Sequence, residues 1–478
     1  MRPRLSHLLT ACLIAAAALG GCGDDAADAP VDAPGGDLLD QLRGLPEVAS
    51  VTEAATDVPG YRFFKLQVDQ PVDHDDPDGP RFQQYVSLIH RDAAAPMVML
   101  HTGYGNWYHD IPHQLTWMLQ ANQIVVEHRF FRGSRPSGGP ADWAALTIRQ
   151  AAADHHRITV ALRRLYAGKW LETGHSKGGM TSVYHRRFHP GDIDGTIAYV
   201  APISFGAPDY RYEAHVEALG PAACRQAVRD LQVELLRNRR AMLDQRAAAE
   251  AAATGAVYGR VTRAAAVESA VVSLEWAFWQ YAGAEACPGV PSTAATDDAV
   301  WQFLSEVSGV SSSSDAEIAE FEAYYYQAEA ELGYPGTMDE HLDGLTQFGA
   351  EAFAGANPVG VTLPPFEPAA MTDVDAWVQA EGERLVFVYG EWDPWSGGMF
   401  ELGAARDSLR VVAARAPHGA DLKDLTAGDR EQVLARIAAW TGVTPDPGRL
   451  FRAVPPPPLP RPHVPPAILR ALQLRARR

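Results

Sequence analysis

The chain has 478 residues with a hydrophobic content of 47% and an aromatic content of 9%, enough for one large α/β domain that carries an insertion. Its formal net charge of −18 at pH 7 leaves no basic surface to neutralise phosphates, which argues against nucleic acid as a partner.

The first 22 residues are typical of an export signal. Arg2 and Arg4 precede the apolar run LLTACLIAAAALG, which is too short to span a bilayer with the usual flanks. The run leads into the letters LGGC, which resemble a bacterial lipoprotein signal in which the cysteine becomes the lipidated first residue. We therefore expect an exported protein anchored to the cell envelope through lipid on Cys22. The alternative is an ordinary secretory signal with a chance cysteine, and hence a secreted protein.

Two cysteines remain once the signal is removed and Cys22 is lipidated. Because Cys12 is lost with the signal, Cys224 and Cys287 form an even pair in an oxidising compartment. We expect a disulfide between them, with two separate buried thiols as the alternative. No later segment has the pattern of a membrane span, so lipid would be the anchor.

After the signal, the residue pattern indicates a core that is interrupted by a helical insertion. Short apolar, β-branched runs indicate buried parallel strands, and they are RFQQYVSLIH, APMVMLHTG, NQIVVEHRFF, KWLETGHS, DGTIAYVAP, RLVFVYGEWD and LRVVAARAPHG. A helical pattern over residues 142–166 separates the third run from the fourth, so the order predicts a doubly wound parallel sheet.

Strand-like runs are replaced by helical periodicity between the fifth and sixth of these runs. QVELLRNRRAMLDQRAAAEAAA and AEIAEFEAYYYQAEAELG are examples, and they predict a helical cap. The expected divisions are a signal at 1–22, a flexible spacer at 23–45, core at 46–207, cap at 208–380, core at 381–444 and a proline-rich, basic tail at 445–478.

The stretch LETGHSKGGMTSVYHRRFHP contains the candidate nucleophile. A strand-like run precedes the turn HSKGG and a helix-like run follows it, so Gly174, Ser176 and Gly178 form a G-x-S-x-G pattern between a strand and a helix. That context exposes the serine hydroxyl above the sheet, and the glycines allow the backbones to approach closely. We predict that Ser176 is a nucleophile rather than a small residue at a tight turn.

A serine hydroxyl is a weak nucleophile at neutral pH, so it needs a general base that is held by an acid. In folds with this turn, the chain order is serine, acid, histidine. Asp393 follows the strand-like run RLVFVYG, and His418 follows the next run in a loop before a helix that starts near Thr426. We expect Asp393 to orient the imidazole of His418 and His418 to accept the proton of the serine.

Other residues near these positions stay open as alternatives. Glu391 or Asp421 could be the acid, and Asp393 could merely cap the helical turn after it. His101 and His175 lie near the nucleophile but precede the acid in the chain, so we expect them to be wall or packing residues.

An oxyanion hole is expected beside the nucleophile. Its first donor should be the backbone N–H of Lys177, immediately after the serine. The second should come from the glycine-rich loop after VMLHTGYGN, around Gly103 and Tyr104, unless this loop is an ordinary turn.

Six motifs in chain order resemble one family. They are QPVDHDDPDGPRFQQYVSLIHR, HTGYGN, EHRFFRGSRP, TGHSKGGMTSVYHRRFHPGDIDGTIAYVAP, YGEWDPWSGG and PHGA, between Phe63 and Ala420. Together they resemble the secreted bacterial tripeptidyl and tetrapeptidyl aminopeptidases, prolyl-type serine peptidases that are similar to prolyl carboxypeptidases.

This resemblance implies an α/β-hydrolase core with a helical cap and the release of short N-terminal peptides that often end in proline. It also implies the triad Ser176, Asp393 and His418, with peptides as partners and neither a cofactor nor a metal. The chain differs from this family in its expected location, because Cys22 suggests a lipid-anchored protein whereas those relatives are freely secreted. Esterases and lipases share this machinery and are the alternative, followed by a lipid-anchored binding protein with a degenerate site.

An aminopeptidase must recognise the α-ammonium group of its substrate, and Glu127 could do so from the end of the run NQIVVE. Alternatively, Glu127 could form an ion pair with Arg129, Arg132 or Arg135 and so fix the loop that carries these arginines. Four aromatic residues could form an apolar slot for a proline ring or could equally belong to the core; they are Tyr104, Trp107, Trp392 and Trp395.

Overall fold

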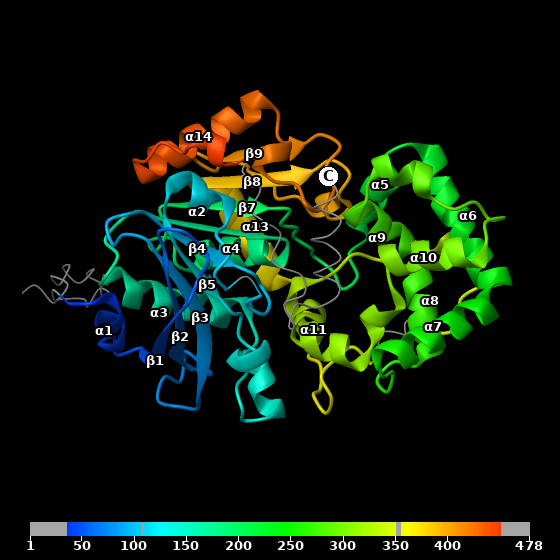
Figure 1. Ribbon diagram of the computed structural model, residues 1–478, viewed down its shortest axis with the longest axis horizontal. Helices are drawn as coiled ribbons and strands as arrows, with labels where there is room; N and C mark the ends of the chain where they lie inside the picture. The colour runs from blue at the N-terminus through cyan, green and yellow to red at the C-terminus, as the bar shows by residue number, and fades with distance from the viewer. Residues whose placement is uncertain (1–35, 108, 350–354, 451–478) are drawn as a thin grey trace, which may run out of the picture.

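The protein consists of an α/β core and a helical cap that lies at one end of it (Figure 1). This computed structural model describes residues 36–107, 109–349 and 355–450. The signal sequence and Cys22 lie outside the described residues, as do most of the expected spacer and tail. No helix in the described part of the chain combines the length and hydropathy needed to cross a bilayer.

Nine strands form one sheet in the order β1-β2-β3-β5-β4-β6-β7-β8-β9. The strands are β1 Val48–Ala54, β2 Arg62–Pro71, β3 Arg81–His90, β4 Met97–His101, β5 Asn122–Val126, β6 Trp170–His175, β7 Gly195–Tyr199, β8 Leu385–Gly390 and β9 Leu409–Ala413. The six strands from β5 to β9 along the sheet are parallel, whereas β1, β2, β3 and β5 pair antiparallel. All residues of β4, β5, β7 and β8 are buried, which explains why their sequences are largely apolar.

The seven strand-like runs of the sequence correspond to β3 through β9, but the expectation of parallel pairing is wrong for β3. This strand pairs antiparallel with β2 and with β5. Strands β1 and β2 were not predicted, because polar residues interrupt them and no continuous apolar run marks them.

Helices cover both faces of the sheet and build the cap. They are α1 Leu38–Arg43, α2 Gln114–Leu119, α3 Ile148–Arg163, α4 Lys177–Phe188, α5 Glu213–Val216, α6 Ala222–Asn238, α7 Arg240–Thr254, α8 Arg263–Val272, α9 Leu274–Tyr281, α10 Asp297–Val307, α11 Asp315–Gln327, α13 Ala369–Glu381 and α14 Ala427–Thr441. On one face, α2 and α14 pack against β7 and β8 through a shared apolar cluster. On the other face, α4 and α13 pack against the same strands. The sheet is thus the middle layer of three, as in a doubly wound fold.

The cap is inserted between the end of β7 and α13, and helices α5 to α10 gather to the right of the sheet in Figure 1. It has an apolar core of its own, to which α6, α8, α9 and α10 contribute; members include Leu231, Val271, Phe278 and Leu304. Residues 228–342 account for most of this cluster, so the cap is a packed unit rather than a long loop.

Three expected boundaries differ from the structure. The cap ends before α13, because Met371 and Val378 of this helix pack against residues of the sheet. The expected spacer ends earlier, because α1 falls within residues 23–45 and buries Leu42 in the core. The expected tail begins later, since Leu450 is still buried against the core.

A disulfide joins Cys224 in α6 to Cys287, which follows α9, as the cysteine count predicts. It closes a loop across a sequence separation of 63 residues that holds α6 to α9 of the cap together.

Removing this disulfide is expected to lower the free energy of unfolding by about 4 kcal/mol, since the cross-link restricts the unfolded chain over a long loop. Urea unfolding of the Cys224→Ser, Cys287→Ser double variant, followed beside the wild type with and without reductant, measures the change. An identical midpoint in oxidised wild type and double variant would show that the bridge does not stabilise the cap.

Candidate active site

Ser176 lies at a sharp turn between β6 and α4. Its backbone has φ 56° and ψ −128°, a strained conformation for a residue with a side chain. The N–H of Ser176 donates to the carbonyl of Tyr199 in β7 at 2.9 Å, which fixes the turn at the end of the sheet. A Cβ on Gly178 would overlap the carbonyl oxygen of His101, so the helix can approach β4 only with glycine there. These are the features of a nucleophile elbow.

Asp393 and His418 form a buried hydrogen-bonded pair. The Asp393 Oδ2 atom lies 2.7 Å from Nδ1 of His418, and the carboxylate is fully buried. The other oxygen of Asp393 accepts from the N–H of Trp395 at 3.0 Å, which holds the carboxylate in place. Nε2 of His418 is buried and has no hydrogen-bond partner among the described residues. With Nδ1 donating to the acid, this nitrogen carries the lone pair that a general base needs.

The three candidate triad residues emerge at the same edge of the sheet. Ser176 follows β6, Asp393 follows β8 and His418 follows β9, and these strands are parallel and belong to one run of neighbours. The carboxyl ends of parallel strands meet at one edge, where ligands bind in open α/β sheets. The arrangement supports a nucleophile, a base and an acid in one site.

The two alternative acids are engaged elsewhere. Glu391 is exposed and accepts from the N–H of Arg415 at 2.7 Å. Asp421 accepts from the N–H of Lys423 at 2.8 Å and caps a short helical turn. Of the three carboxylates, the one that contacts His418 is therefore that of Asp393.

The two histidines near the elbow are packing residues, as expected. The ring of His175 stacks on that of Tyr199, with centroids 4.4 Å apart. Nε2 of His101 lies 3.2 Å from a carboxylate oxygen of Glu172, inside the core.

The expected oxyanion loop contacts the start of α4. Gly103 has φ 74°, and a Cβ there would overlap the backbone of Lys177 and Gly178. The N–H of Tyr104 donates to Oγ1 of Thr102 at 3.1 Å. Of the two loop residues expected to supply a donor, Gly103 is therefore the better placed, because Tyr104 uses its N–H within the loop.

The side chain of Lys177 has a role that the sequence did not reveal. Its Nζ is buried, donates to the carbonyl of Gly103 at 2.6 Å and lies 5.5 Å from the centroid of the Tyr104 ring. Burial lowers the pKa of this ammonium group to about 7. The contact ties the oxyanion loop to the first turn of α4, and no sequence pattern marks it.

The structure supports neither of the two roles predicted for Glu127, recognition of the substrate ammonium group or an ion pair with an arginine. Its carboxylate is buried and accepts from the N–H of Asn106 at 3.0 Å and from the N–H and hydroxyl of Ser134 at 3.2 and 2.9 Å. Burial raises its pKa, and these hydrogen bonds oppose that rise. Glu127 therefore holds two loops together and is not exposed to a substrate.

The arginines expected as partners of Glu127 pair with other carboxylates. Arg129 pairs with Asp154 inside the core, while Arg132 and Arg135 pair with Glu320 and Glu322 of α11. The loop after β5 is thereby joined to the cap.

The two tryptophans beside Asp393 differ in their surroundings. Trp392 is half-buried and lines a cavity of about 440 Å³ together with His215, Leu219, Gly220 and Glu391. Trp395 instead packs edge-to-face against Trp276 of the cap, with centroids 5.2 Å apart. The ring centroid of Trp395 also lies 6.1 Å from that of His418, so both tryptophans stay candidates for contact with substrate.

The aromatic residues near the oxyanion loop pack against the cap. Tyr104 stacks on Trp107 with centroids 5.8 Å apart, and both rings contact Phe321 of α11. Nε1 of Trp107 also donates to Glu320 at 3.1 Å. These contacts place α11 over the loop that carries Gly103.

Two residues of the cap contact the acid–base pair directly. The carbonyl of Gln280 in α9 accepts from the N–H of His418 at 3.0 Å. Nε2 of His215 in α5 lies 2.9 Å from the carbonyl oxygen of Asp393. The sequence could not reveal either contact, because each involves a backbone group and joins two residues that are more than 130 positions apart in the chain.

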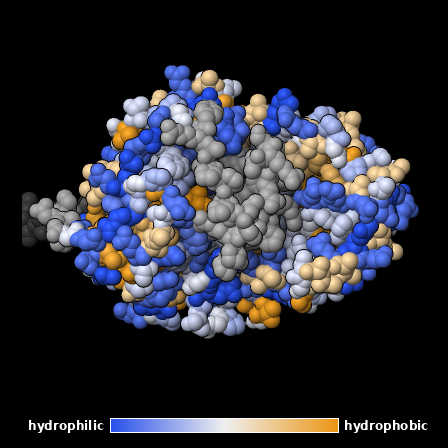
Figure 2. Space-filling model, viewed as in Figure 1, coloured by the Kyte–Doolittle hydropathy of each residue, from blue (hydrophilic) through white to orange (hydrophobic). Residues whose placement is uncertain are grey.

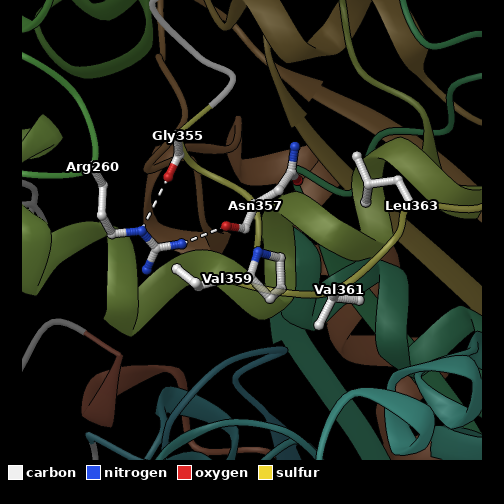
Figure 3. Close-up of a pocket in the computed structure, with 7 residues that line it drawn as sticks. Arg260, Gly355, Asn357, Val359, Val361 and Leu363 are labelled. Carbon is white, nitrogen blue, oxygen red and sulfur yellow. Dashed lines mark hydrogen bonds between the residues drawn. The ribbon is translucent and has the colours of Figure 1, made fainter.

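A second cavity, of about 420 Å³, lies on the cap and is lined by Arg260 and the segment 355–363 (Figure 3). The guanidinium of Arg260 donates to the carbonyls of Gly355 and Asn357 and pairs with Glu322 at 2.8 Å. Because these partners already engage its charge, this arginine is not free to bind a substrate carboxylate.

A buried chain of charged groups links the strand and the helix that flank the nucleophile elbow. Nδ1 of His185 in α4 lies 2.8 Å from Glu172 in β6, and its Nε2 lies 3.1 Å from Asp192. Burial alone would lower the pKa of His185, but the two carboxylates raise it to about 9. Burial likewise opposes ionisation of Glu172, yet His185 and His101 lower its pKa to about 2. Glu172 and His185 thus join the strand before Ser176 to the helix after it.

The charge on His185 is expected to make stability fall at alkaline pH. Its pKa is raised on folding, so its contribution of about 3 kcal/mol is fully present below pH 6.5 and is lost as the pH rises through about 9. Urea unfolding between pH 6.5 and 10 should show a steeper loss in the wild type than in His185→Gln. Parallel pH dependences in the two proteins would contradict a charged His185.

The elbow and the buried acid–base pair, at one edge of a largely parallel sheet, define a serine hydrolase of the α/β-hydrolase class. The family described as PS-10 peptidase S37 matches residues 32–452, and the chain belongs to this family. It is 37% identical over 452 residues to the prolyl tri/tetrapeptidyl aminopeptidase of Streptomyces mobaraensis. The aligned residues cover 93% of each of the two chains. The protein is thus a serine exopeptidase of the aminopeptidase type, and the resemblance noted in its motifs is confirmed.

Solved structures of other α/β-hydrolases also match. The proline iminopeptidase of Mycobacterium smegmatis is 12% identical, with a TM-score of 0.34, and the match covers 78% of this chain and 96% of that one. An epoxide hydrolase from an endophytic Streptomyces is 13% identical with a TM-score of 0.35, covering 80% and 96%.

Proposed function

We propose that the protein releases tripeptides or tetrapeptides, many ending in proline, from the free N-termini of peptide substrates. The observation that carries this proposal is the buried Asp393–His418 pair with an unpartnered Nε2, at the same sheet edge as Ser176. The preference for short peptides and for proline is taken from the name of the Streptomyces relative and is supported by the identity of 37% over 93% of the chain.

The reaction proceeds through an acyl-enzyme. Oγ of Ser176 attacks the scissile carbonyl carbon while Nε2 of His418 takes its proton, and Asp393 stabilises the resulting imidazolium. The N–H groups of Lys177 and Gly103 stabilise the oxyanion. His418 then protonates the leaving amine, and the N-terminal peptide stays bound to Ser176 as an ester. Water, deprotonated by His418, cleaves this ester and releases the peptide.

A panel of chromogenic di-, tri- and tetrapeptides, free and N-acetylated, tests the proposal on the chain from residue 23 onward. Free-amine tri- or tetrapeptides should be cleaved about tenfold to a hundredfold faster than their acetylated forms, since recognition of the ammonium uses a charge-assisted hydrogen bond. Proline before the leaving group should be preferred to alanine. Equal cleavage of free and blocked peptides would contradict the aminopeptidase assignment.

Cleavage of simple esters alone, with no peptide turnover, would favour the esterase alternative. Hydrophilic residues predominate on the described part of the face in Figure 2, and hydrophobic residues there are scattered or in small groups. The described part of this face that is visible in Figure 2 therefore presents no broad apolar lid of the kind that a lipase uses at a lipid surface.

We also propose that lipid on Cys22 anchors the exported protein to the cell envelope, on the basis of the apolar run and the letters LGGC. Cys22→Ser should move the protein from the membrane pellet to the soluble fraction. An unchanged distribution between pellet and soluble fraction would rule out this anchor.

A further inference from the structure

Three metal-ligating side chains meet on the core at the end of α4 that is remote from Ser176. His156 extends from α3, His189 follows the last residue of α4, and Asp192 lies in the loop that leads to β7. Each offers one ligand atom, and these atoms lie within 4.8 Å of one another. All three residues are partly exposed, so an ion can reach them from solvent.

His189 lies directly beside the other two candidate ligands. Its ring stacks on that of His156 with centroids 4.1 Å apart. Within the described chain, no hydrogen bond occupies either of its ring nitrogens. An imidazole whose ring nitrogens make no hydrogen bond, placed beside a carboxylate, is well positioned to donate to a metal ion.

The carboxylate of Asp192 is held in place by two histidines. Its Oδ2 lies 2.8 Å from Nδ1 of His156 and 3.1 Å from Nε2 of His185, which Glu172 orients in turn. His185 is not one of the three candidate ligands, so it is an outer partner of the kind that fixes ligand orientation in metal sites.

The neighbouring cluster of His101, Glu172 and His185 does not have this character. All three are buried, and both histidines direct a ring nitrogen at the same oxygen of Glu172, at 3.2 and 2.8 Å. Their ligand atoms therefore have no access from solvent, unlike those of the partly exposed cluster.

We propose that His156, His189 and Asp192 form a binding site for a divalent transition-metal ion of the zinc type, separate from the catalytic machinery. Two imidazoles and one carboxylate are a ligand set that suits zinc, with water in the fourth position. Zinc–nitrogen distances of about 2.0–2.1 Å place tetrahedral ligands roughly 3.3 Å apart, so modest side-chain rotations close the observed arrangement. The ion would join α3 to the end of α4, about 18 Å along the helix from the elbow.

Metal binding can be measured on the chain from residue 23 onward, produced without a histidine tag. Titration with Co²⁺, followed by its visible absorption, should saturate at one ion per chain, and Zn²⁺ should displace the Co²⁺. His189→Ala and His156→Ala should each weaken Co²⁺ binding at least about tenfold. Zn²⁺ should also raise the Tm of the wild type but not of these variants.

His341→Ala is the matched control, because His341 is a half-buried histidine of the cap whose Nε2 lies 3.0 Å from Gln232. It should bind Co²⁺ as the wild type does. Unchanged peptide turnover by His189→Ala in metal-free buffer would show that this variant is folded. The proposal is overturned if the wild type binds no stoichiometric Co²⁺, or if His189→Ala and His156→Ala bind it as tightly as the wild type.

Discussion

Ser176→Ala is expected to lower kcat/KM on peptide substrates by about 10⁵- to 10⁶-fold, because without the hydroxyl no acyl-enzyme can form and the remaining groups act only on water. The folded state should be retained, since the backbone of Ser176 makes the hydrogen bond to Tyr199 that fixes the turn. Steady-state rates and a fluorophosphonate titration measure the loss.

Ser182→Ala is the matched control for this experiment. Ser182 is a buried serine of the same helix, and its hydroxyl donates to the carbonyl of Gly179 at 2.7 Å. This variant should react with one equivalent of fluorophosphonate and keep its turnover within about tenfold of the wild type. Labelling of Ser176→Ala at the wild-type rate would place the nucleophile elsewhere.

Asp393→Asn is expected to lower kcat by about 10⁴-fold while leaving the geometry of the site nearly intact. The buried carboxylate selects the tautomer of His418 in which Nδ1 carries the proton and Nε2 can accept the serine proton. A neutral amide can instead donate to Nδ1, which moves the proton to the wrong nitrogen, and it cannot stabilise an imidazolium. Single-turnover kinetics would show whether acylation has slowed.

The control is Glu391→Gln, two residues away on the same loop. Glu391 is exposed and bonded to the backbone of Arg415, so its loss should change kcat by less than about tenfold. If Glu391→Gln lost more activity than Asp393→Asn, the acid of the triad would be Glu391.

Much of the core could be predicted because buried parallel strands are continuous apolar runs. All seven such runs became strands, and the change to helical periodicity marked the cap. The exceptions have local causes. Strands β1 and β2 are interrupted by exposed charged residues such as Glu53 and Lys65. Helix α13 was assigned to the cap because a helix that covers a sheet and a helix within a cap have the same periodicity.

The candidate triad could be predicted because each member follows a strand, and the order of the strands brings their ends to one edge. What could not be predicted depends on contacts made across the fold by groups without a sequence signature. Glu127 is an example, since its partners are the backbone of Asn106 and Ser134 rather than an arginine. The bond from Lys177 to the carbonyl of Gly103 is another.

The contacts of the cap with the acid–base pair bear on which molecules can reach the site. Gln280 bonds to the backbone of His418 and His215 to that of Asp393, so a wide swing of the cap would break two hydrogen bonds at the very residues that align the base. An enzyme whose cap is wide open would therefore lack two of the contacts that align its catalytic base. We therefore expect the enzyme to cleave short, extended peptides and to resist folded protein substrates, which would need a wide opening of the cap.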